Sequence, residues 1–435
     1  MTLSTESPRT RSMHVDAARL LDHLDLLRSV GATPEGGVSR PAFGDADVRG
    51  RELVAGFMRE AGMRVHVDPA ANLIGAFPAR RPELGALVLG SHLDTVPNGG
   101  SLDGAYGVIA AVEVMRTLHE NRVEMDHPVM VVAFSNEEGA HGTPAMFGSR
   151  AVAGQVDASE LDTRLDDGRV LSALVDAAGG DSKRIDQARW PGDAIASYME
   201  LHIEQGPSLE GERLQIGVVE GITGRLTAEV VVRGEHNHGG TTPMDARRDA
   251  LVAAAQVVLA VQDMATRGGL VRVATVGECS VRPGAWNVIP GEVRLVVDLR
   301  DVSAQAIRAG LLKLRLDARR ISDRTATSIT VTPQQLVVPA MCDERLRGLV
   351  EDAAVDLGLG YRSMPSGAGH DAQWIARIAP MGMIFVPSRG GVSHAPHEWT
   401  DPSDLVNGAN VLLNCTLAGD RAFRAGAVFA GEAEA

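Results

Sequence analysis

Histidine and carboxylate side chains gather in a glycine-rich stretch of the chain, GSHLDTVPNGGSLDG, which spans residues 90–104. It contains His92, Asp94 and Asp103, and it follows directly on the apolar segment ALVLG. Imidazole nitrogens and carboxylate oxygens are typical ligands of zinc and related divalent cations. The alternative is a surface turn, because Asp, Asn and Gly are also the usual residues of turns.

The same combination recurs at three further places, each in or after a run of residues typical of a strand. Glu137 and Glu138 follow PVMVVAF, His202 lies in YMELHIEQGP, and His394 follows MGMIFVP. Adjacent carboxylates repel each other, and a divalent cation would relieve that repulsion with one carboxylate as ligand and the other as base. Most adjacent Glu pairs are solvated acidic turns, but the recurrence at several strand ends favours a metal site.

Short apolar segments alternate with helical patterns in the first half of the chain. Strands are predicted over 72–77, 86–90 and 128–134, and helices over 15–30, 47–63 and 105–119. Continuous apolar runs between helices are typical of a sheet buried on both faces, so we predict an α/β catalytic domain with a mainly parallel central sheet. Ligands bind such sheets at the carboxyl ends of the strands, where these histidines and carboxylates stand.

A different pattern begins near Gly221. Its order is strand, helix, strand, strand, helix, strand, with predicted elements at 225–234, 244–266, 270–279, 291–300, 304–316 and 328–333. This is the order of a ferredoxin-like α+β domain of two layers. We therefore predict a catalytic domain in two parts, residues 1–220 and 336–435, with an inserted lid or dimerisation domain at 221–335.

The amino-acid composition and net charge argue against some classes of binding partner. The 435 residues are 44% hydrophobic and 23% charged, as in globular proteins, and the net charge of −14 disfavours nucleic acid and anionic membranes as partners. Three widely spaced cysteines disfavour a disulfide scaffold and a thiolate zinc site. We find no apolar run of about 18 residues and no secretory signal, so we expect a cytoplasmic protein without membrane contact.

Six motifs in one order carry a family resemblance: GSHLDTVPNGGSLDG, SNEEG, LHIEQGP, NHGGTTPM, SGAGHD and SHAPHE. Together they resemble the hydantoinase/carbamoylase amidases, which include N-carbamoyl-L-amino-acid hydrolase, allantoate amidohydrolase and β-ureidopropionase. These enzymes are related to the dinuclear metallopeptidases, from which HIEQGP separates them. The resemblance covers nearly the whole chain. NHGG stands where the family commonly has Asn-His-Ala-Gly, a change that removes no functional group.

The resemblance implies two divalent metal ions in each subunit, which are zinc, manganese, cobalt or nickel. His92 and His202 would bind one ion, Glu138 and His394 would bind the other, and Asp103 would bridge both. The glycines around Asp103 would let the backbone turn tightly enough to aim its carboxylate at two ions.

The resemblance also implies a mechanism. A hydroxide bridged by the two ions would attack a ureido carbonyl, and Glu137 as general base would pass the proton to the leaving nitrogen. Asp94 would fix the tautomer of the His92 imidazole. The favoured reaction converts an N-carbamoyl-L-amino acid into the L-amino acid, CO2 and NH3. Allantoate amidohydrolase comes second and β-ureidopropionase third, and a catalytically silent metal-binding homologue is the alternative from another class.

Three residues match family positions that bind the small-molecule ureido acid substrate: His238, Asn287 and Arg300. Gln205 would add a polar contact from the catalytic domain. Arg300 would grip the substrate carboxylate, a bidentate task that suits guanidinium. Asn287 is also compatible with a simple turn, Arg300 with the end of a strand, and His236 competes with His238. Because this histidine commonly reaches a neighbouring subunit in relatives, the resemblance implies a homodimer through the inserted domain.

Overall fold

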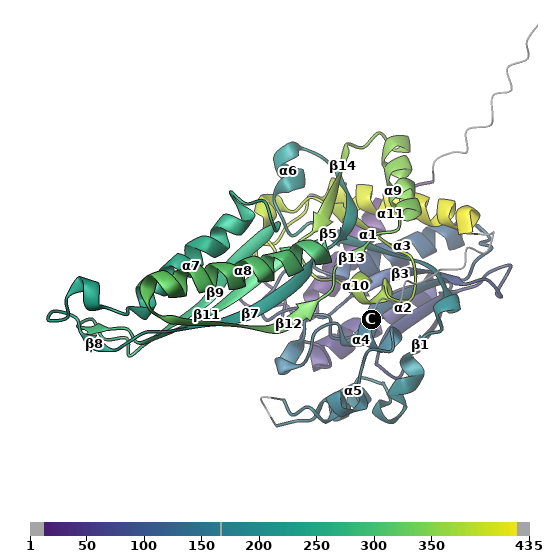
Figure 1. The fold of residues 1–435 in the computed structure, drawn as a ribbon. Helices are drawn as coiled ribbons and strands as arrows, with labels where there is room; N and C mark the ends of the chain where they lie inside the picture. The colour runs from purple at the N-terminus through teal and green to yellow at the C-terminus, as the bar shows by residue number, and fades with distance from the viewer. Residues whose placement is uncertain (1–12, 166–167, 424–435) are drawn as a thin grey trace, which may run out of the picture. The chain divides into compact units, whose positions relative to one another are not determined.

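The computed structural model describes residues 13–165 and 168–423 and divides into two compact units. The first unit runs to Glu220 and resumes at Cys342, and the second spans Gly221–Met341. The sequence suggested residues 221–335 for the inserted part. Each unit has its own sheet and its own hydrophobic core (Figure 1).

The first unit is built on a mixed sheet. Its strands are β1 (Arg64–Val67), β2 (Leu73–Phe77), β3 (Ala86–His92), β4 (Val129–Phe134), β5 (Ile195–Ile203), β6 (Ile216–Ile222), β14 (Tyr361–Ser366) and β15 (Met381–Val386). They follow the order β1-β2-β4-β3-β5-β15-β6, and β14 also pairs with β6. The central strands β4, β3, β5 and β15 run parallel, whereas β1, β2 and β6 pair antiparallel with their neighbours.

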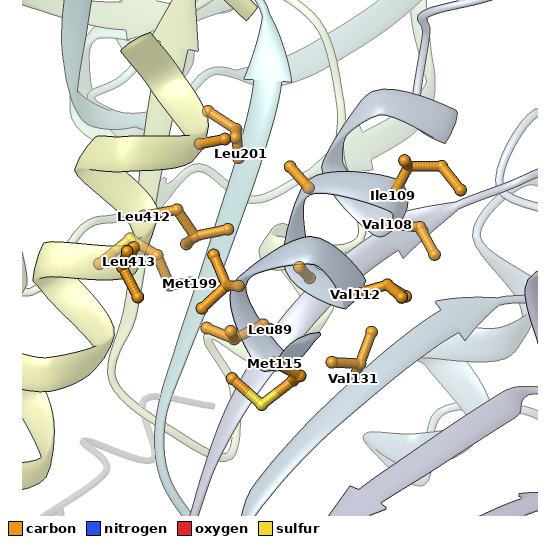
Figure 2. Packing of buried hydrophobic residues seen from close by; sticks show 14 of the residues in the cluster. Leu89, Val108, Ile109, Val112, Met115, Val131, Met199, Leu201, Leu412 and Leu413 are labelled. Carbon is orange, nitrogen blue, oxygen red and sulfur yellow. The ribbon is translucent and has the colours of Figure 1, made fainter. Parts of the chain in front are cut away.

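Helices pack on this sheet and bury its apolar side chains. They are α1 (Ala17–Ser29), α2 (Asp45–Glu60), α3 (Ala105–Glu120), α4 (Phe147–Val152), α5 (Leu171–Ala177), α6 (Ser208–Glu212), α9 (Glu344–Asp356), α10 (Ala372–Ile375) and α11 (Pro402–Ala422). Helix α3 packs against β3 and β5, and α11 packs against α3 and β15. Figure 2 shows side chains of this core, including Val112 and Met115 of α3 and Leu412 of α11.

Strand β5 shows how the sheet separates its two faces. Met199 and Leu201 belong to the core under α3. Glu200 and His202 point to the opposite face, because side chains alternate along a strand. Glu200 is fully buried, and its carboxylate accepts hydrogen bonds from two hydroxyl groups and one backbone N–H. The strand predicted within YMELHIEQGP therefore has one apolar face and one polar face, and the polar face carries His202.

The second unit contains β7 (Gly224–Arg233), α7 (Ala250–Ala265), β9 (Val273–Arg282), β11 (Glu292–Asp301), α8 (Ala304–Thr325) and β12 (Ser328–Val337). The strands pair antiparallel in the order β12-β7-β11-β9, which is the ferredoxin-like arrangement predicted from the element order. Helices α7 and α8 lie side by side on the sheet, and a small two-stranded sheet of β8 (Asn237–His238) and β10 (Val288–Ile289) extends from one end of the unit (Figure 1).

Two helices of the second unit differ in length from the sequence prediction. The helix predicted over 244–266 begins at Ala250, because Asp249 caps it by accepting hydrogen bonds from two backbone N–H groups of the first turn. The helix predicted over 304–316 continues to Thr325, because apolar side chains of its later turns, such as Ile321, also pack into the core of this unit.

The expected fold class is confirmed. Parallel strands form the centre of the first sheet, and a separate antiparallel sheet with two helices is inserted between its two segments. None of the helices in the described ranges combines the length and the hydropathy that crossing a bilayer requires.

Gly107 in α3 provides a test of the packing between helix and sheet. Alanine favours helices over glycine by about 1 kcal/mol. A Cβ at Gly107, however, would lie 2.2 Å from the backbone oxygen of Leu201. We therefore expect Gly107→Ala to lower the free energy of unfolding by about 1–3 kcal/mol, as overpacked cores do.

The matched control is Gly348→Ala in α9, where a Cβ would meet nothing within 4 Å. It should raise the stability by about 0.5–1 kcal/mol, because only the helix propensity changes there. Urea unfolding followed by circular dichroism measures both. Equal shifts for the two variants would contradict the packing described for α3 and β5.

Candidate metal centre

Four loops meet at the carboxyl ends of the parallel strands β4, β3, β5 and β15, which are neighbours in the sheet. His92 ends β3, Glu137 and Glu138 follow β4, His202 stands near the end of β5, and His394 lies in the loop after β15. Because parallel strands end at one edge of the sheet, these five side chains approach one another although they are far apart in the sequence.

Asp103, in the loop before α3, lies at the centre of this group and is almost fully buried. Its Oδ1 is 3.1 Å from His202 Nε2 and 3.5 Å from His92 Nε2. Its Oδ2 is 3.1 Å from His394 Nε2, which is itself 3.6 Å from Glu138 Oε1. The two oxygens of one carboxylate thus face two separate sets of ligand atoms, as a bridging ligand requires.

The orientation of the two buried imidazoles tests whether a cation fits there. His92 Nδ1 is 3.0 Å from the backbone oxygen of Asp94, and His202 Nδ1 is 2.9 Å from that of Ile203. A carbonyl oxygen only accepts, so each Nδ1 is assigned the hydrogen, and a neutral ring turns the lone pair of Nε2 toward Asp103. Facing lone pairs repel unless a proton or a metal ion lies between them. The donor set therefore fits a divalent cation.

Four sets of side chains among the described residues could hold such an ion, with ligand atoms within 4.8 Å of one another: His92–Asp103–His202, Asp103–Glu138–His394, His92–Glu137–Glu138 and Glu200–His202–His370. The first two sets are those that the family resemblance assigns to two ions, and they share Asp103. In addition, Glu138 Oε1 is buried and has no hydrogen-bond partner among the described residues. Histidine with carboxylate suits several divalent metals, so the ligands alone do not select one.

Gly104 is required by the way His92 packs. Its backbone has φ +61°, and a Cβ at this position would lie 2.4 Å from ring atoms of His92. A side chain at position 104 would therefore displace the imidazole that faces Asp103. This glycine serves the turn and the close approach together.

Asp94 holds the loop that carries the two glutamates. Its Oδ1 accepts a hydrogen bond from the Glu137 N–H (3.2 Å), and its Oδ2 accepts one from the Glu138 N–H (3.1 Å). The sequence prediction gave the Asp94 carboxylate the task of fixing the His92 tautomer. In the structure this carboxylate lies 3.9 Å from His92 Nδ1, and the backbone carbonyl of the same residue is nearer.

Burial and like charges raise the pKa of both glutamates. Burial raises the pKa of Glu137 well above its usual range, and Glu138 adds to this although His92 opposes it. Burial and the neighbouring Asp103 raise the pKa of Glu138 to about 7. For Asp103 burial alone would raise the pKa, but the three histidines that face it hold its pKa well below the usual range. The Asp103 carboxylate is therefore held in its charged form, which attracts positively charged groups to it.

Two residues with left-handed backbone complete the centre in the first unit. His394 has φ +56°, and its hydrogen bond to Asp103 raises its pKa to about 9 against the opposing effect of burial. Gln205 has φ +57°, and its Nε2 donates a hydrogen bond to Asp103 Oδ2 (2.8 Å). Gln205 Oε1 is buried without a partner among the described residues. The predicted contact of Gln205 with substrate stays a prediction.

His238 and Asn287 lie together at the small sheet of β8 and β10 in the second unit. The residue after Asn287 pairs with His238, and the Gly239 N–H donates a hydrogen bond to the Asn287 carbonyl oxygen (2.8 Å). His238 Nδ1 accepts hydrogen bonds from two backbone N–H groups, at 3.0 and 3.1 Å, so the neutral ring carries its hydrogen on Nε2. His236, the competing candidate, packs its ring against Gly291 instead.

Arg300 stands at the opposite end of the second unit from this small sheet. Its Nε and Nη2 donate hydrogen bonds to the Asp298 carboxylate, at 3.0 and 3.1 Å. Strand β10 of the small sheet ends just before Glu292 at the start of β11, and Arg300 lies eight residues further along β11. Eight strand residues span about 27 Å. One copy of the second unit therefore does not bring Arg300 to His238 and Asn287.

The sequence prediction missed buried groups that support the ligands. Glu398 accepts a hydrogen bond from the Asp103 N–H (3.2 Å), and its place in the SHAPHE motif, four residues after His394, was a signal that could have found it. Arg40 is fully buried, and its Nε donates to the backbone oxygen of Leu93 (2.6 Å), the residue after a predicted ligand. Nothing in the sequence around Arg40 indicates this contact.

Residues 88–418 match peptidase family M20/M25/M40. The chain is 41% identical over 400 residues to an N-carbamoyl-L-amino acid amidohydrolase of Geobacillus stearothermophilus, which covers 92% of this chain and 98% of the relative. It is 34% identical over 422 residues to a ureidoglycolate hydrolase of Arabidopsis thaliana, and the match covers 94% of this chain and 87% of that relative. The crystal structure of a hydantoinase/carbamoylase family amidase from Burkholderia ambifaria superimposes with a TM-score of 0.87 at 37% identity, covering 94% of this chain and 98% of that one.

The shared position of Asp103 predicts how metal content changes with substitution. Asp103→Ala should lose both cations, whereas His202→Ala and His394→Ala should each lose one, because each histidine belongs to one of the two predicted sets. Metal per chain is measured by inductively coupled plasma mass spectrometry after gel filtration. His397→Ala, an exposed histidine of the same loop, is the control and should bind as many ions as the unaltered chain. An Asp103→Ala variant with full metal content would contradict this assignment.

Proposed function

Because the chain belongs to peptidase family M20/M25/M40, in its hydantoinase/carbamoylase amidase branch, we propose that it hydrolyses N-carbamoyl-L-amino acids to the L-amino acid, CO2 and NH3. It is an amidohydrolase of linear C–N bonds, as its relatives are. The observation that carries the proposal is the buried Asp103 carboxylate with an imidazole facing each oxygen at 3.1 Å.

In this proposal His92 and His202 would hold one divalent cation, Glu138 and His394 would hold the second, and Asp103 would contribute a ligand to each. Bound cations would supply a lower pKa for a water molecule and polarisation of the substrate carbonyl. The protein contributes fixed ligands, since each buried imidazole is oriented by a backbone carbonyl behind it.

Glu137 acts as the general base. It takes a proton from the attacking water while the C–O bond forms, and it gives that proton to the leaving nitrogen while the C–N bond breaks. Burial raises its pKa, which suits a group that must both accept and donate a proton near neutral pH. Asp94 keeps this carboxylate in place through the Glu137 backbone N–H.

The second unit recognises the substrate. His238 presents an Nε2–H donor, which suits an oxyanion that develops on the ureido carbonyl. Asn287 stands beside it, and Arg300 binds the substrate carboxylate. Asp298 holds one edge of the Arg300 guanidinium and so orients the group.

Because β11 separates His238 from Arg300 within one chain, the proposed binding of substrate by both residues requires two subunits. An N-carbamoyl amino acid is far shorter than the about 27 Å that eight strand residues span. His238 and Arg300 can therefore touch the same substrate only if they come from different copies of the chain. Helix α7 supports a homodimer through this unit, because its outer face exposes Leu251, Val252 and Leu259.

Other ureido acids are the alternatives. The relative from Arabidopsis thaliana is a ureidoglycolate hydrolase, and a relative from rice is a probable allantoate deiminase. β-Ureidopropionase activity on N-carbamoyl-β-alanine is a further alternative, and a metal-binding homologue without catalysis is the alternative of another class. The identity of 41% to a carbamoyl-amino-acid amidohydrolase favours the first proposal.

Ammonia release tests the substrate. The metal-loaded protein is compared on N-carbamoyl-L-methionine, N-carbamoyl-β-alanine, allantoate and ureidoglycolate, and release of methionine from N-acetyl-L-methionine serves as control. We expect the highest kcat/KM with N-carbamoyl-L-methionine. A preference for allantoate or ureidoglycolate would overturn the proposed substrate, and no turnover of any ureido acid would favour the silent homologue.

The two adjacent glutamates should respond differently to the same substitution. Glu137→Gln should lower kcat by about 100-fold to 10,000-fold with both cations retained, because only the proton acceptor is lost. Glu138→Gln should lose one cation, because an amide is a weaker ligand than a carboxylate. Turnover is followed by ammonia release and metal content by mass spectrometry. A Glu137→Gln variant with normal turnover would show that another group is the base.

Mixing two inactive variants tests the shared site. His238→Ala and Arg300→Met should each be nearly inactive as homodimers. After both are unfolded and refolded together, random pairing should restore about a quarter of the unaltered activity, since half of the dimers then hold one complete site. The control uses Arg294→Met in place of Arg300→Met. Arg294 is an exposed arginine of the same strand, so the Arg294→Met homodimer should be active without any mixing. Failure to restore activity, or a monomer by light scattering, would contradict the shared site.

A further inference from the structure

Glu398 lies against the loop that carries Asp103. The side chain is buried, and its Oε1 accepts hydrogen bonds from the backbone N–H groups of Leu102 (2.9 Å) and Asp103 (3.2 Å). A Cβ at Gly100 would lie 2.0 Å from Glu398 Cδ. The loop between β3 and α3 is therefore shaped around this carboxylate, and the glycine leaves room for it.

The second oxygen of Glu398 reaches the Asp103 carboxylate through one hydroxyl group. Ser393 Oγ is 2.9 Å from Glu398 Oε2 and 3.0 Å from Asp103 Oδ2. A hydroxyl carries one hydrogen, so Ser393 donates to only one of the two carboxylates at a time. Glu398 therefore competes with Asp103 for this hydrogen.

This competition matters because Asp103 Oδ2 has few lone pairs available for hydrogen bonds or a metal ion. A carboxylate oxygen has about two lone-pair sites, and Gln205 Nε2 already donates to Oδ2 at 2.8 Å. A hydrogen bond from Ser393 would use the second pair and leave none for a cation. Donation from Ser393 to Glu398 keeps that pair available.

We propose that Glu398 is a positioning residue for the metal centre: it fixes the backbone of Asp103 and draws the Ser393 hydrogen away from Asp103 Oδ2. The inference rests on the proposed function, in that it takes the Asp103 site to hold metal ions. A plain structural role for Glu398, as a cap for the loop alone, predicts a loss of stability without a specific loss of metal affinity.

Glu398→Gln separates these two roles. The amide keeps an acceptor oxygen for the two backbone N–H groups, but its nitrogen presents hydrogens to Ser393, which must then donate to Asp103. Zinc affinity, measured by competition with a chelator, should fall by about 10-fold to 100-fold. The absorption spectrum of the cobalt-loaded protein should change as well. Ser393→Ala alone should stay near the unaltered affinity, and Glu398→Gln combined with Ser393→Ala should regain most of the loss, because the competing hydrogen is gone.

Asp420→Asn provides the matched control. The Asp420 carboxylate is also buried and accepts hydrogen bonds from two consecutive backbone N–H groups, those of Asp126 and His127, at 3.0 and 2.8 Å. It should lower the Tm and leave the zinc affinity within about two-fold, because it lies outside the sets of ligands around Asp103.

Two results would overturn the inference. Glu398→Gln with unchanged zinc affinity and a lowered Tm would make Glu398 a loop cap, and a double variant without recovery would remove the role of the Ser393 hydrogen. An unaltered chain that binds no zinc would overturn the proposed function itself, which the variants of Glu398 alone would not do.

Discussion

Crowding of carboxylates at one buried point governs the arrangement of the first unit. Asp94, Asp103, Glu137 and Glu138 lie close together with little access to water. Like charges in such surroundings repel strongly, so the fold has to balance them. Hydrogen bonds do part of this work, since Asp94 is held by two backbone N–H groups and Asp103 by its neighbours. The remaining excess of negative charge is what makes the centre suitable for divalent cations.

The parallel centre of the sheet supplies the precision that such a site needs. Strands β4, β3, β5 and β15 end side by side, and each delivers one side chain or one pair to the same edge. Alternation along β5 sends Leu201 into the apolar core and His202 toward Asp103. His92 and His202 therefore stand on strands fixed by packing, whereas Asp103, Glu137 and Glu138 lie in the adjoining loops, and His394 lies in a loop and is exposed. Rigid support of this kind keeps ligand atoms in place when no cation is bound.

In the second unit, the residues predicted to bind substrate lie at two opposite ends. Its long antiparallel strands separate the small sheet that carries His238 and Asn287 from Arg300, while local contacts fix each group in its own place. A substrate-binding role for both ends is compatible with a small substrate only in an assembly of two copies. The outer face of α7 agrees with such an assembly, because it exposes several large apolar side chains that a second copy would cover.

The sequence by itself determined the fold class and the order of the elements in the inserted unit, since these follow from hydrophobic period and strand ends, and its ordered motifs carried the family resemblance that named the side chains expected around Asp103. It did not determine the start of the helix at Ala250, which depends on a local cap by Asp249. It also gave no view of the buried contacts of Glu398 and Arg40, or of the separation between His238 and Arg300. Only the tertiary structure decided these, because hydrogen bonds between residues 53 and 295 positions apart and the length of a strand between two groups leave no periodic trace in the chain.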